Sequence, residues 1–190
     1  MARPKSEDKR NAILAAAVEV IDAQGVGAPT AKIAKLAGVA EGTLFTYFAS
    51  KDELLNQLYL DLKLELRDVM ASRFPRTGSV RERAQHAWDA YVDWGVAHPQ
   101  RRKVMSLLGA SHLVTDASKA AGMDAFADVN ATMHEALASG VLRDHPPSFV
   151  AAIMGSIAET TMDFIAHEPT QHDRYRNAGF DVFWHAVAAP

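Results

Sequence analysis

Hydroxyl and cationic side chains are concentrated between residues 30 and 51, where they suit the recognition of a polyanion. Threonine and tyrosine hydroxyls donate hydrogen bonds to phosphate oxygens and base edges, and lysine ammonium groups neutralise phosphates. The residues able to make such contacts are Thr30, Lys32, Thr43, Thr46, Tyr47 and Lys51. Residues 1–51 also carry seven Lys or Arg and five acidic residues, although the whole chain has a net charge of −3. This end of the chain is therefore the candidate for binding nucleic acid.

Two short helices joined by a tight turn are predicted to position these side chains. Ile33 and Ala37 lie one turn apart on an inward stripe, and Gly38 ends that helix because glycine readily adopts the left-handed conformation. The next helix is predicted over residues 41–47, with Leu44 directed inward. This arrangement is a helix-turn-helix, whose second helix lies in the major groove of DNA.

The same segment resembles the amino-terminal signature of the tetracycline-repressor-like (TetR) family of transcriptional regulators. The matching positions are Ile13-Leu14, Ala17, Gly25, Ile33-Ala34, Ala37-Gly38-Val39, Gly42-Thr43-Leu44-Phe45, Tyr47-Phe48, Lys51 and Leu54-Leu55. The resemblance implies an all-α protein with an amino-terminal three-helix DNA-binding domain and a carboxyl-terminal helical ligand-binding and dimerisation domain. The DNA-binding residues that it implies are Thr30, Ala31, Lys32, Glu41, Gly42, Thr43, Phe45, Thr46, Tyr47 and Lys51.

Three positions depart from the family's pattern. The run Ala28-Pro29-Thr30 stands where the family usually has a pair of hydroxyl residues, which leaves Thr30 to contact a phosphate. Phe45 replaces the common tyrosine of the recognition helix, and Ala31 stands where some members have a long base-reading side chain. These departures change the expected operator contacts but not the expected binding mode.

Length and composition fit a protein with one large or two small domains. The chain has 190 residues, and its 48% hydrophobic content is ample for a packed core. We expect no membrane span and no signal peptide, because apolar runs are short and the first residues are polar. The sequence contains zero cysteines, which excludes disulfides and thiolate chemistry. A cytoplasmic protein without a membrane partner is expected.

Catalysis and metal binding form a separate class of function. His134-Glu135 lacks the second histidine of a His-Glu-x-x-His zinc helix, and His112 with Asp116 offers two ligands without an identifiable third. The sequence also lacks a Gly-x-Ser-x-Gly nucleophile elbow and a glycine-rich phosphate loop. We therefore expect neither enzyme activity nor a metal or cofactor.

Helical periodicity and chain breakers predict roughly nine helices. Capping boxes are expected at Ser50 and Ser79, and Phe74–Gly78 is the clearest break. The expected helices cover approximately residues 7–24, 30–37, 41–47, 51–73, 80–98, 100–109, 116–138, 147–167 and 171–187. We expect a DNA-binding domain over residues 1–50 and a helical regulatory and dimerisation domain over residues 51–190.

The last two predicted helices are expected to form a self-association surface. Two adjacent apolar helices can pair with a symmetry mate as a four-helix bundle. The proposed dimerisation residues are Ile157, Thr161, Phe164, Phe180, Phe183 and Trp184. The same apolar stripes would also complete the core of a monomer, and it is the resemblance that favours a homodimer.

Large, pliable apolar side chains are concentrated in the middle of the chain. Methionine and aromatic residues adapt to irregular cavities, and the resemblance implies a small-molecule effector bound between these helices. The proposed ligand-binding residues are Trp88, Tyr91, Met105, Phe126 and Met133. The alternative for each of them is plain core packing, which is the commoner role of such residues.

These observations predict a ligand-responsive transcriptional regulator. It would repress by occupying an inverted-repeat operator as a homodimer, and a small, mostly apolar molecule would release it. The alternative is an all-helical DNA-binding protein without a small-molecule ligand, which acts by occlusion or through a protein partner. A solidly packed regulatory domain would favour that alternative.

Overall fold

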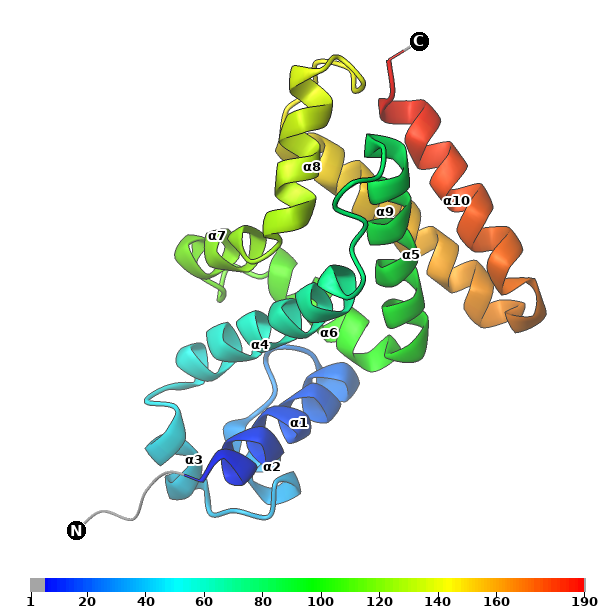
Figure 1. The fold of residues 1–190 in the computed structure, drawn as a ribbon. Helices are drawn as coiled ribbons and strands as arrows, with labels where there is room; N and C mark the ends of the chain where they lie inside the picture. Colours follow the sequence, from blue (N-terminus) through cyan, green and yellow to red (C-terminus); the bar gives the residue numbers. More distant parts are fainter. Residues whose placement is uncertain (1–5, 190) are drawn as a thin grey trace. The chain divides into compact units, whose positions relative to one another are not determined.

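The computed structural model describes residues 6–189, whose regular secondary structure is helical (Figure 1). Ten α-helices and one short 3-10 helix (η1, Pro169–Gln171) occupy these residues, together with an isolated bridge between Leu142 and Ala188. The predicted all-α class is therefore confirmed. The helices are α1 (Glu7–Gln24), α2 (Thr30–Leu36), α3 (Glu41–Tyr47), α4 (Lys51–Ala71), α5 (Val80–Ala97), α6 (Pro99–Ala110), α7 (Asp116–Asp124), α8 (Ala127–Ala138), α9 (Pro147–His167) and α10 (His172–Val187).

The chain divides into two compact units that are interleaved in sequence. The first contains the described residues up to Leu64 together with Pro99–Met123, and the second contains Glu65–His98 and the described residues from Asp124 onward. The long helix α4 contributes its first part to the first unit and its last part to the second. The predicted division after residue 50 stays a prediction, because compactness alone does not show which segments fold or act independently.

The first unit has a core built from the inward stripes of α1 to α4. Ile13, Ile33, Leu44 and Leu55 are all fully buried, and Phe48 is 1% exposed. Helix α1 packs against both α2 and α6, and α2 packs against α3. Burial of these side chains fixes the short helices α2 and α3, which are too short to be stable on their own.

Capping explains where two of the longer helices begin. The predicted capping box at Ser79 is complete, because the serine hydroxyl accepts from Glu82 N and the Glu82 carboxylate accepts from Ser79 N. The predicted box at Ser50 is formed in part. Ser50 Oγ accepts from Glu53 N at 3.0 Å, whereas the Glu53 carboxylate accepts from Ala49 N at 2.6 Å, one residue before the expected donor.

The second unit has an aromatic core in which α5, α9 and α10 meet. Trp88, Phe180 and Met162 are fully buried, and the ring of Trp88 stacks on that of Phe183 with 6.0 Å between centroids. The indole Nε1 of Trp88 donates to the carbonyl oxygen of Arg176 at 2.9 Å, which satisfies its polar atom within the core. This core joins α10 to α5 and α9.

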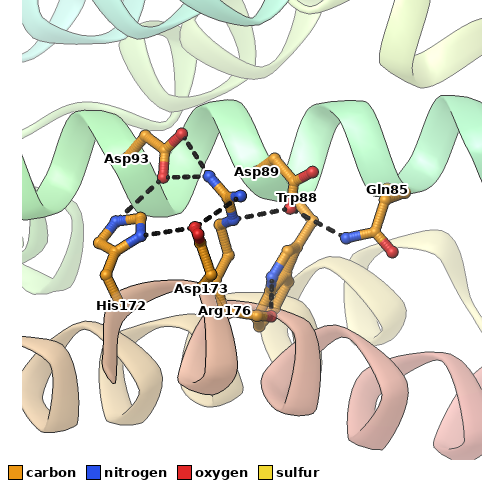
Figure 2. A network of polar contacts seen from close by, with 7 residues as sticks. All are labelled: Gln85, Trp88, Asp89, Asp93, His172, Asp173 and Arg176. Atoms are coloured by element: carbon orange, nitrogen blue, oxygen red, sulfur yellow. Dashed lines mark hydrogen bonds and ion pairs between the residues drawn. The ribbon is translucent and has the colours of Figure 1, made fainter. Parts of the chain in front are cut away.

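A polar network lies beside that core on the facing surfaces of α5 and α10 (Figure 2). The Arg176 guanidinium on α10 forms ion pairs with Asp89 and Asp93 on α5, at 3.4 and 2.7 Å, and with Asp173 at 3.1 Å. His172 Nε2 lies 3.2 Å from the Asp93 carboxylate. Because Asp93 and Asp173 are largely solvated, the network orients α10 more than it stabilises it.

The predicted helix over residues 116–138 is corrected to two helices, and the count rises from nine to ten. The chain leaves the helical conformation at Phe126, which has φ −90° and ψ 51° and precedes α8. The Phe126 side chain is only 8% exposed, so burial of this ring accompanies the break. Neither proline nor glycine stands at residues 124–127, and the usual sequence signal for a break is therefore missing there.

Among the described helices, α9 has a length and composition that would allow it to cross a membrane. Its 21 residues contain a window with mean hydropathy 1.4, and 28% of that window is buried. In the structure α9 packs against α5 and α10. The core helix of a water-soluble protein meets the same test, and so the finding is weak evidence for a membrane.

Candidate nucleic-acid interface

Helices α2 and α3 are joined by a turn in which Gly38 has a positive φ of 69°. Val39 N donates to the carbonyl oxygen of Ala34 at 3.0 Å, and Ala37 N donates to that of Ile33 at 2.9 Å. These bonds close the end of α2 and direct the chain into α3. The predicted end of the helix at Gly38 and the predicted helix-turn-helix are both confirmed.

Helix α3 presents a mixed polar and aromatic face to solvent. Leu44 anchors the helix from below, whereas Glu41, Gly42 and Thr46 are exposed. Phe45 is 42% exposed and is the large apolar side chain of this face. Thr43 and Tyr47 are half-buried at the edges of this face.

Several of the predicted DNA-binding side chains already have partners within the first unit. Thr30 Oγ1 donates to Glu41 Oε1 at 2.7 Å, which joins the starts of α2 and α3. The Tyr47 hydroxyl accepts from Ser6 N at 3.0 Å, and Thr46 Oγ1 donates to the Gly42 carbonyl oxygen at 3.1 Å. Phosphate or base contacts by the Thr30 and Thr46 hydroxyls would exchange these internal hydrogen bonds for external ones.

The other predicted DNA-binding residues lie at or near helix starts. Lys51 is the first residue of α4 and is half-buried, and Ala31 and Lys32 are exposed in the first turn of α2. Lys32 Nζ donates to Gln24 Oε1 at 2.5 Å, a solvent-exposed contact that is easily exchanged. Arg10 on α1 lies 3.5 Å from the Asp61 carboxylate.

The described helices have the same arrangement as several solved structures. A protein from Shewanella sp. PV-4 assigned to the tetR family of transcription regulators is 29% identical with a TM-score of 0.87, covering 96% of this chain and 99% of that one. Residues 13–58, which contain α2 and α3, match the family described as bacterial regulatory proteins, tetR family. The chain has the fold of tetR-family transcription regulators. Its helix-turn-helix lies at the amino-terminal end, within the matched segment.

Two further tetR-fold structures extend this comparison. A TetR family transcription regulator from Marinobacter aquaeolei VT8 is 23% identical with a TM-score of 0.87, covering 97% of each chain. The transcriptional regulator FadR from Bacillus subtilis, solved in complex with stearoyl-CoA, is 18% identical with a TM-score of 0.69. That match covers 91% of this chain and 96% of FadR. At these identities the two structures show a shared fold.

The predicted ligand-binding residues of this protein are distributed over different places. Met133 lines a cavity of about 40 Å³ in the second unit, and Phe126 lines a neighbouring cavity of about 150 Å³. Trp88 and Tyr91 belong to the same unit but line neither of these two cavities, and Met105 is a buried residue of the first unit. The five residues together therefore do not line one of these cavities.

Burial divides the predicted dimerisation residues into two groups. Phe180, Phe183 and Thr161 are at most 6% exposed and face the core of their own protomer. Phe164 is 51% exposed, and Ile157 and Trp184 are half-buried. Only the second group offers area to a second copy.

Large exposed apolar residues that were not predicted for this surface also occur on α9 and α10. They are Phe149 and Val182.

The charged residue of the cavity lined by Met133 was not predicted from the sequence. Arg83 on α5 is buried and lines the cavity that also contains Met133. Its available signal was spacing, because Arg83 stands one helical turn before Ala87 on the inward side of α5. No cluster of three or more His, Cys, Asp or Glu residues with metal-binding geometry occurs within residues 6–189.

Proposed function

We propose that this protein is a repressor that occupies an inverted-repeat DNA operator as a homodimer in the cytoplasm. We further propose that a small, mostly apolar molecule releases it from the operator. The observation that carries the proposal is the exposed face of α3 within the segment that matches the tetR family. Leu44 and Phe48 fix this helix from behind, leaving its other side chains for DNA.

In this proposal α3 lies in the major groove and its flanks hold the phosphates. Thr43, Thr46 and Tyr47 reach base edges or phosphates from α3, while Thr30 and Lys51 hold the backbone. Phe45 makes an apolar contact, for which the thymine methyl group is the natural partner in the major groove. Lys51 adds a phosphate contact that is independent of sequence.

A homodimer is required because one seven-residue helix reads only a few base pairs. A two-fold dimer reads two half-sites, whose centres lie about 34–36 Å apart or at a multiple of that distance. The supporting observation is the apolar surface of the last two helices, where Phe164 is 51% and Val182 is 59% exposed. Burial of this surface against a second copy would remove both side chains from water.

Ligand response is proposed from the fold and from the cavities of the second unit. The FadR of Bacillus subtilis, which shares the fold, was solved with stearoyl-CoA bound. A ligand can release the operator only if it binds two conformations of the regulator with unequal affinity, typically by about 1–3 kcal/mol. The cavity lined by Met133 is the proposed site.

The second candidate function is repression without a small molecule. The observation that favours it is the small volume of the cavity lined by Met133, about 40 Å³, which must enlarge before a drug-sized molecule can enter. In this case DNA occupancy alone, or a protein partner, would control transcription.

Selection of bound sequences from random duplex DNA tests the DNA-binding half of the proposal. Recovery of an inverted repeat with the stated half-site spacing supports it, and recovery of no enriched sequence contradicts it. Gel-shift titrations on the selected operator, repeated with a panel of small apolar molecules, then test release. Undiminished DNA binding with every member of the panel favours repression without a ligand.

A further inference from the structure

An arginine lies inside an otherwise apolar cavity of the second unit. Arg83 on α5 is 9% exposed, and among the described residues that line this cavity it is the only charged one. Val80, Ala87, Met133 and Trp184 are among its apolar neighbours there. Because a guanidinium cannot be deprotonated in a protein, the cavity wall holds a permanent positive charge.

The Arg83 guanidinium is incompletely paired. Its Nη2 donates to Glu135 Oε1 at 2.6 Å, and its buried Nε has no hydrogen-bond partner within the described part of the chain. The hydrogen bond between Arg83 and Glu135 raises the pKa of Arg83 and lowers the pKa of Glu135, so both groups are ionised at neutral pH. The Glu135 side chain is 55% exposed, and water therefore competes with Arg83 for its carboxylate.

Stability does not account for a guanidinium at this position. A buried N–H group without a partner is unfavourable, and an apolar residue of similar volume in place of a buried ionic group is often neutral or stabilising. Methionine, an unbranched apolar residue, would suit the apolar walls of this cavity although it is shorter than arginine. Arg83 is better explained by a task that requires a positive charge in an apolar site.

We propose that Arg83 binds the carboxylate of an apolar ligand inside this cavity. The proposal rests on the ligand response proposed above and gives that ligand a chemical class: an apolar body with a single carboxylate. Nε and Nη2 lie on one edge of the guanidinium, where they can hold both oxygens of a carboxylate. Glu135 can yield Nη2 to the ligand because its own carboxylate can turn into water.

The surroundings of the cavity indicate where the apolar body would lie. A cavity of about 40 Å³ holds only a few water molecules, since each needs roughly 10–15 Å³ of such space. The neighbouring cavity of about 150 Å³ shares Phe74 and Val129 with it as wall residues. Phe74 lies in the connection between α4 and α5 and is half-buried. Arg67 and Asp128 line the neighbouring cavity beside its apolar residues. Displacement of the Phe74 ring would join the two spaces into one mostly apolar site, suited to an alkyl chain.

Calorimetric titration of the full-length protein tests this assignment with two matched pairs of ligands. The pairs are octanoate with 1-octanol and decanoate with 1-decanol, each below the concentration at which it aggregates. We expect each carboxylate to bind at least tenfold more tightly than its alcohol. Arg83→Met should weaken carboxylate binding at least tenfold and leave alcohol binding unchanged. Glu135→Gln should strengthen carboxylate binding, because it removes the competing anion.

Arg81→Met is the matched control for the loss of an ion-paired arginine from α5. Arg81 Nη2 lies 3.0 Å from the Asp181 carboxylate, its side chain is 54% exposed, and it does not line the cavity. This variant should bind both carboxylates like the wild type. Melting curves should show that Arg83→Met is at least as stable as the wild type. If Arg83→Met does not fold, carboxylate binding by Glu135→Gln tests the assignment instead, because position 135 is exposed and the change is nearly isosteric.

Three results would overturn the assignment: no carboxylate binding by the wild type, equal binding by Arg83→Met, or no gain in Glu135→Gln. Failure of this assignment is distinguishable from failure of the proposed function. If an alcohol releases the protein from its selected operator while the carboxylates do not bind, ligand response stands and the carboxylate class is wrong. If the protein selects no operator, the repressor proposal fails whatever the calorimetry shows.

Discussion

Gly179 on α10 lies directly against the indole ring of Trp88 on α5. A Cβ atom placed on Gly179 would lie 2.7 Å from Trp88 Cζ2 and would also overlap the hydroxyl oxygen of Thr161 on α9. All three residues are buried, and Trp88 donates to the carbonyl oxygen of Arg176, one turn earlier on α10. The close packing of α10 against α5 and α9 therefore depends on the absence of a side chain at position 179.

Gly179→Ala should destabilise the protein even though alanine favours helices. Overpacking of a close-packed core typically costs about 1–3 kcal/mol, which exceeds the gain of up to about 1 kcal/mol from replacing a helical glycine. Urea unfolding of the two proteins at equal concentration measures the difference. Gly155→Ala on α9 is the matched control. Apart from its chain neighbours and the backbone of its own helix, no described atom lies within 4 Å of a Cβ added there. Equal or greater stability of Gly179→Ala would show that α10 can move away from α5 and α9 at no cost in stability.

The capping box at the start of α5 should make the stability of the protein depend on pH. Hydrogen bonds from the backbone N–H and the hydroxyl of Ser79 lower the pKa of Glu82 below its ordinary value of 4.5. A carboxylate whose folded pKa is depressed contributes stability above its unfolded pKa, and this contribution is lost as the pH falls through the folded pKa. The decrease in Tm between pH 7 and pH 3 should therefore be smaller for Glu82→Gln than for the wild type.

Glu19→Gln supplies the control for that comparison, because Glu19 is exposed on α1 and the change is chemically the same. Its Tm should fall between pH 7 and pH 3 as much as that of the wild type. If Glu82→Gln also shows the full wild-type decrease, the lowered pKa of the Glu82 carboxylate makes no measurable contribution to stability.

Much of the helix-turn-helix could be predicted from the sequence because its determinants are local. Gly38 adopts the positive φ that its position required, and α3 begins and ends at the predicted residues Glu41 and Tyr47. The break at Phe126 could not be predicted, because it depends on burial of a ring and not on proline or glycine. Local signals are informative about helix ends, and tertiary packing is not encoded in them.

Which residues of the second unit are buried and which are exposed could be predicted less well, for a related reason. Helix α10 carries apolar residues on several sides, so the sequence did not distinguish buried Phe180 and Phe183 from exposed Val182. An arginine is ordinarily a surface residue, and its spacing one turn before Ala87 does not show that a cavity lies beside Arg83. Both distinctions depend on which face of a helix another helix covers.

Lys51→Ala should weaken binding to operator and to unrelated DNA by similar factors. Lys51 begins α4, and loss of one phosphate contact should reduce the slope of log affinity against log salt by about 0.9. Fluorescence anisotropy at several salt concentrations measures both quantities. Arg81→Ala, which removes a cation from the second unit, should leave the slope unchanged. An unaltered slope in Lys51→Ala would remove this residue from the interface.

Phe164→Glu should convert the proposed dimer into monomers of 20.7 kDa. Phe164 is 51% exposed, so a carboxylate there is tolerated by the protomer but not by an apolar interface. Light scattering after size-exclusion chromatography measures the mass, and tight operator binding should be lost together with dimerisation. Leu107→Glu is a like change at an exposed leucine on α6 and should preserve both properties. A dimeric Phe164→Glu protein would place the interface elsewhere.

Glu41→Gln should increase the affinity for DNA of any sequence. Glu41 is exposed at the start of α3 and accepts from Thr30 Oγ1 at 2.7 Å, a bond that glutamine can preserve through its carbonyl oxygen. Removal of one negative charge near a phosphate changes the interaction by about 1 kcal/mol at 4 Å in water, or roughly fivefold, and less as salt is added. Anisotropy titrations with operator and unrelated DNA measure the effect, and Glu19→Gln on α1 is the control for a change in net charge. Weaker binding to the operator alone would contradict this expectation and would mean that the Glu41 carboxylate accepts a hydrogen bond from a base, for which the cytosine amino group is the suitable donor.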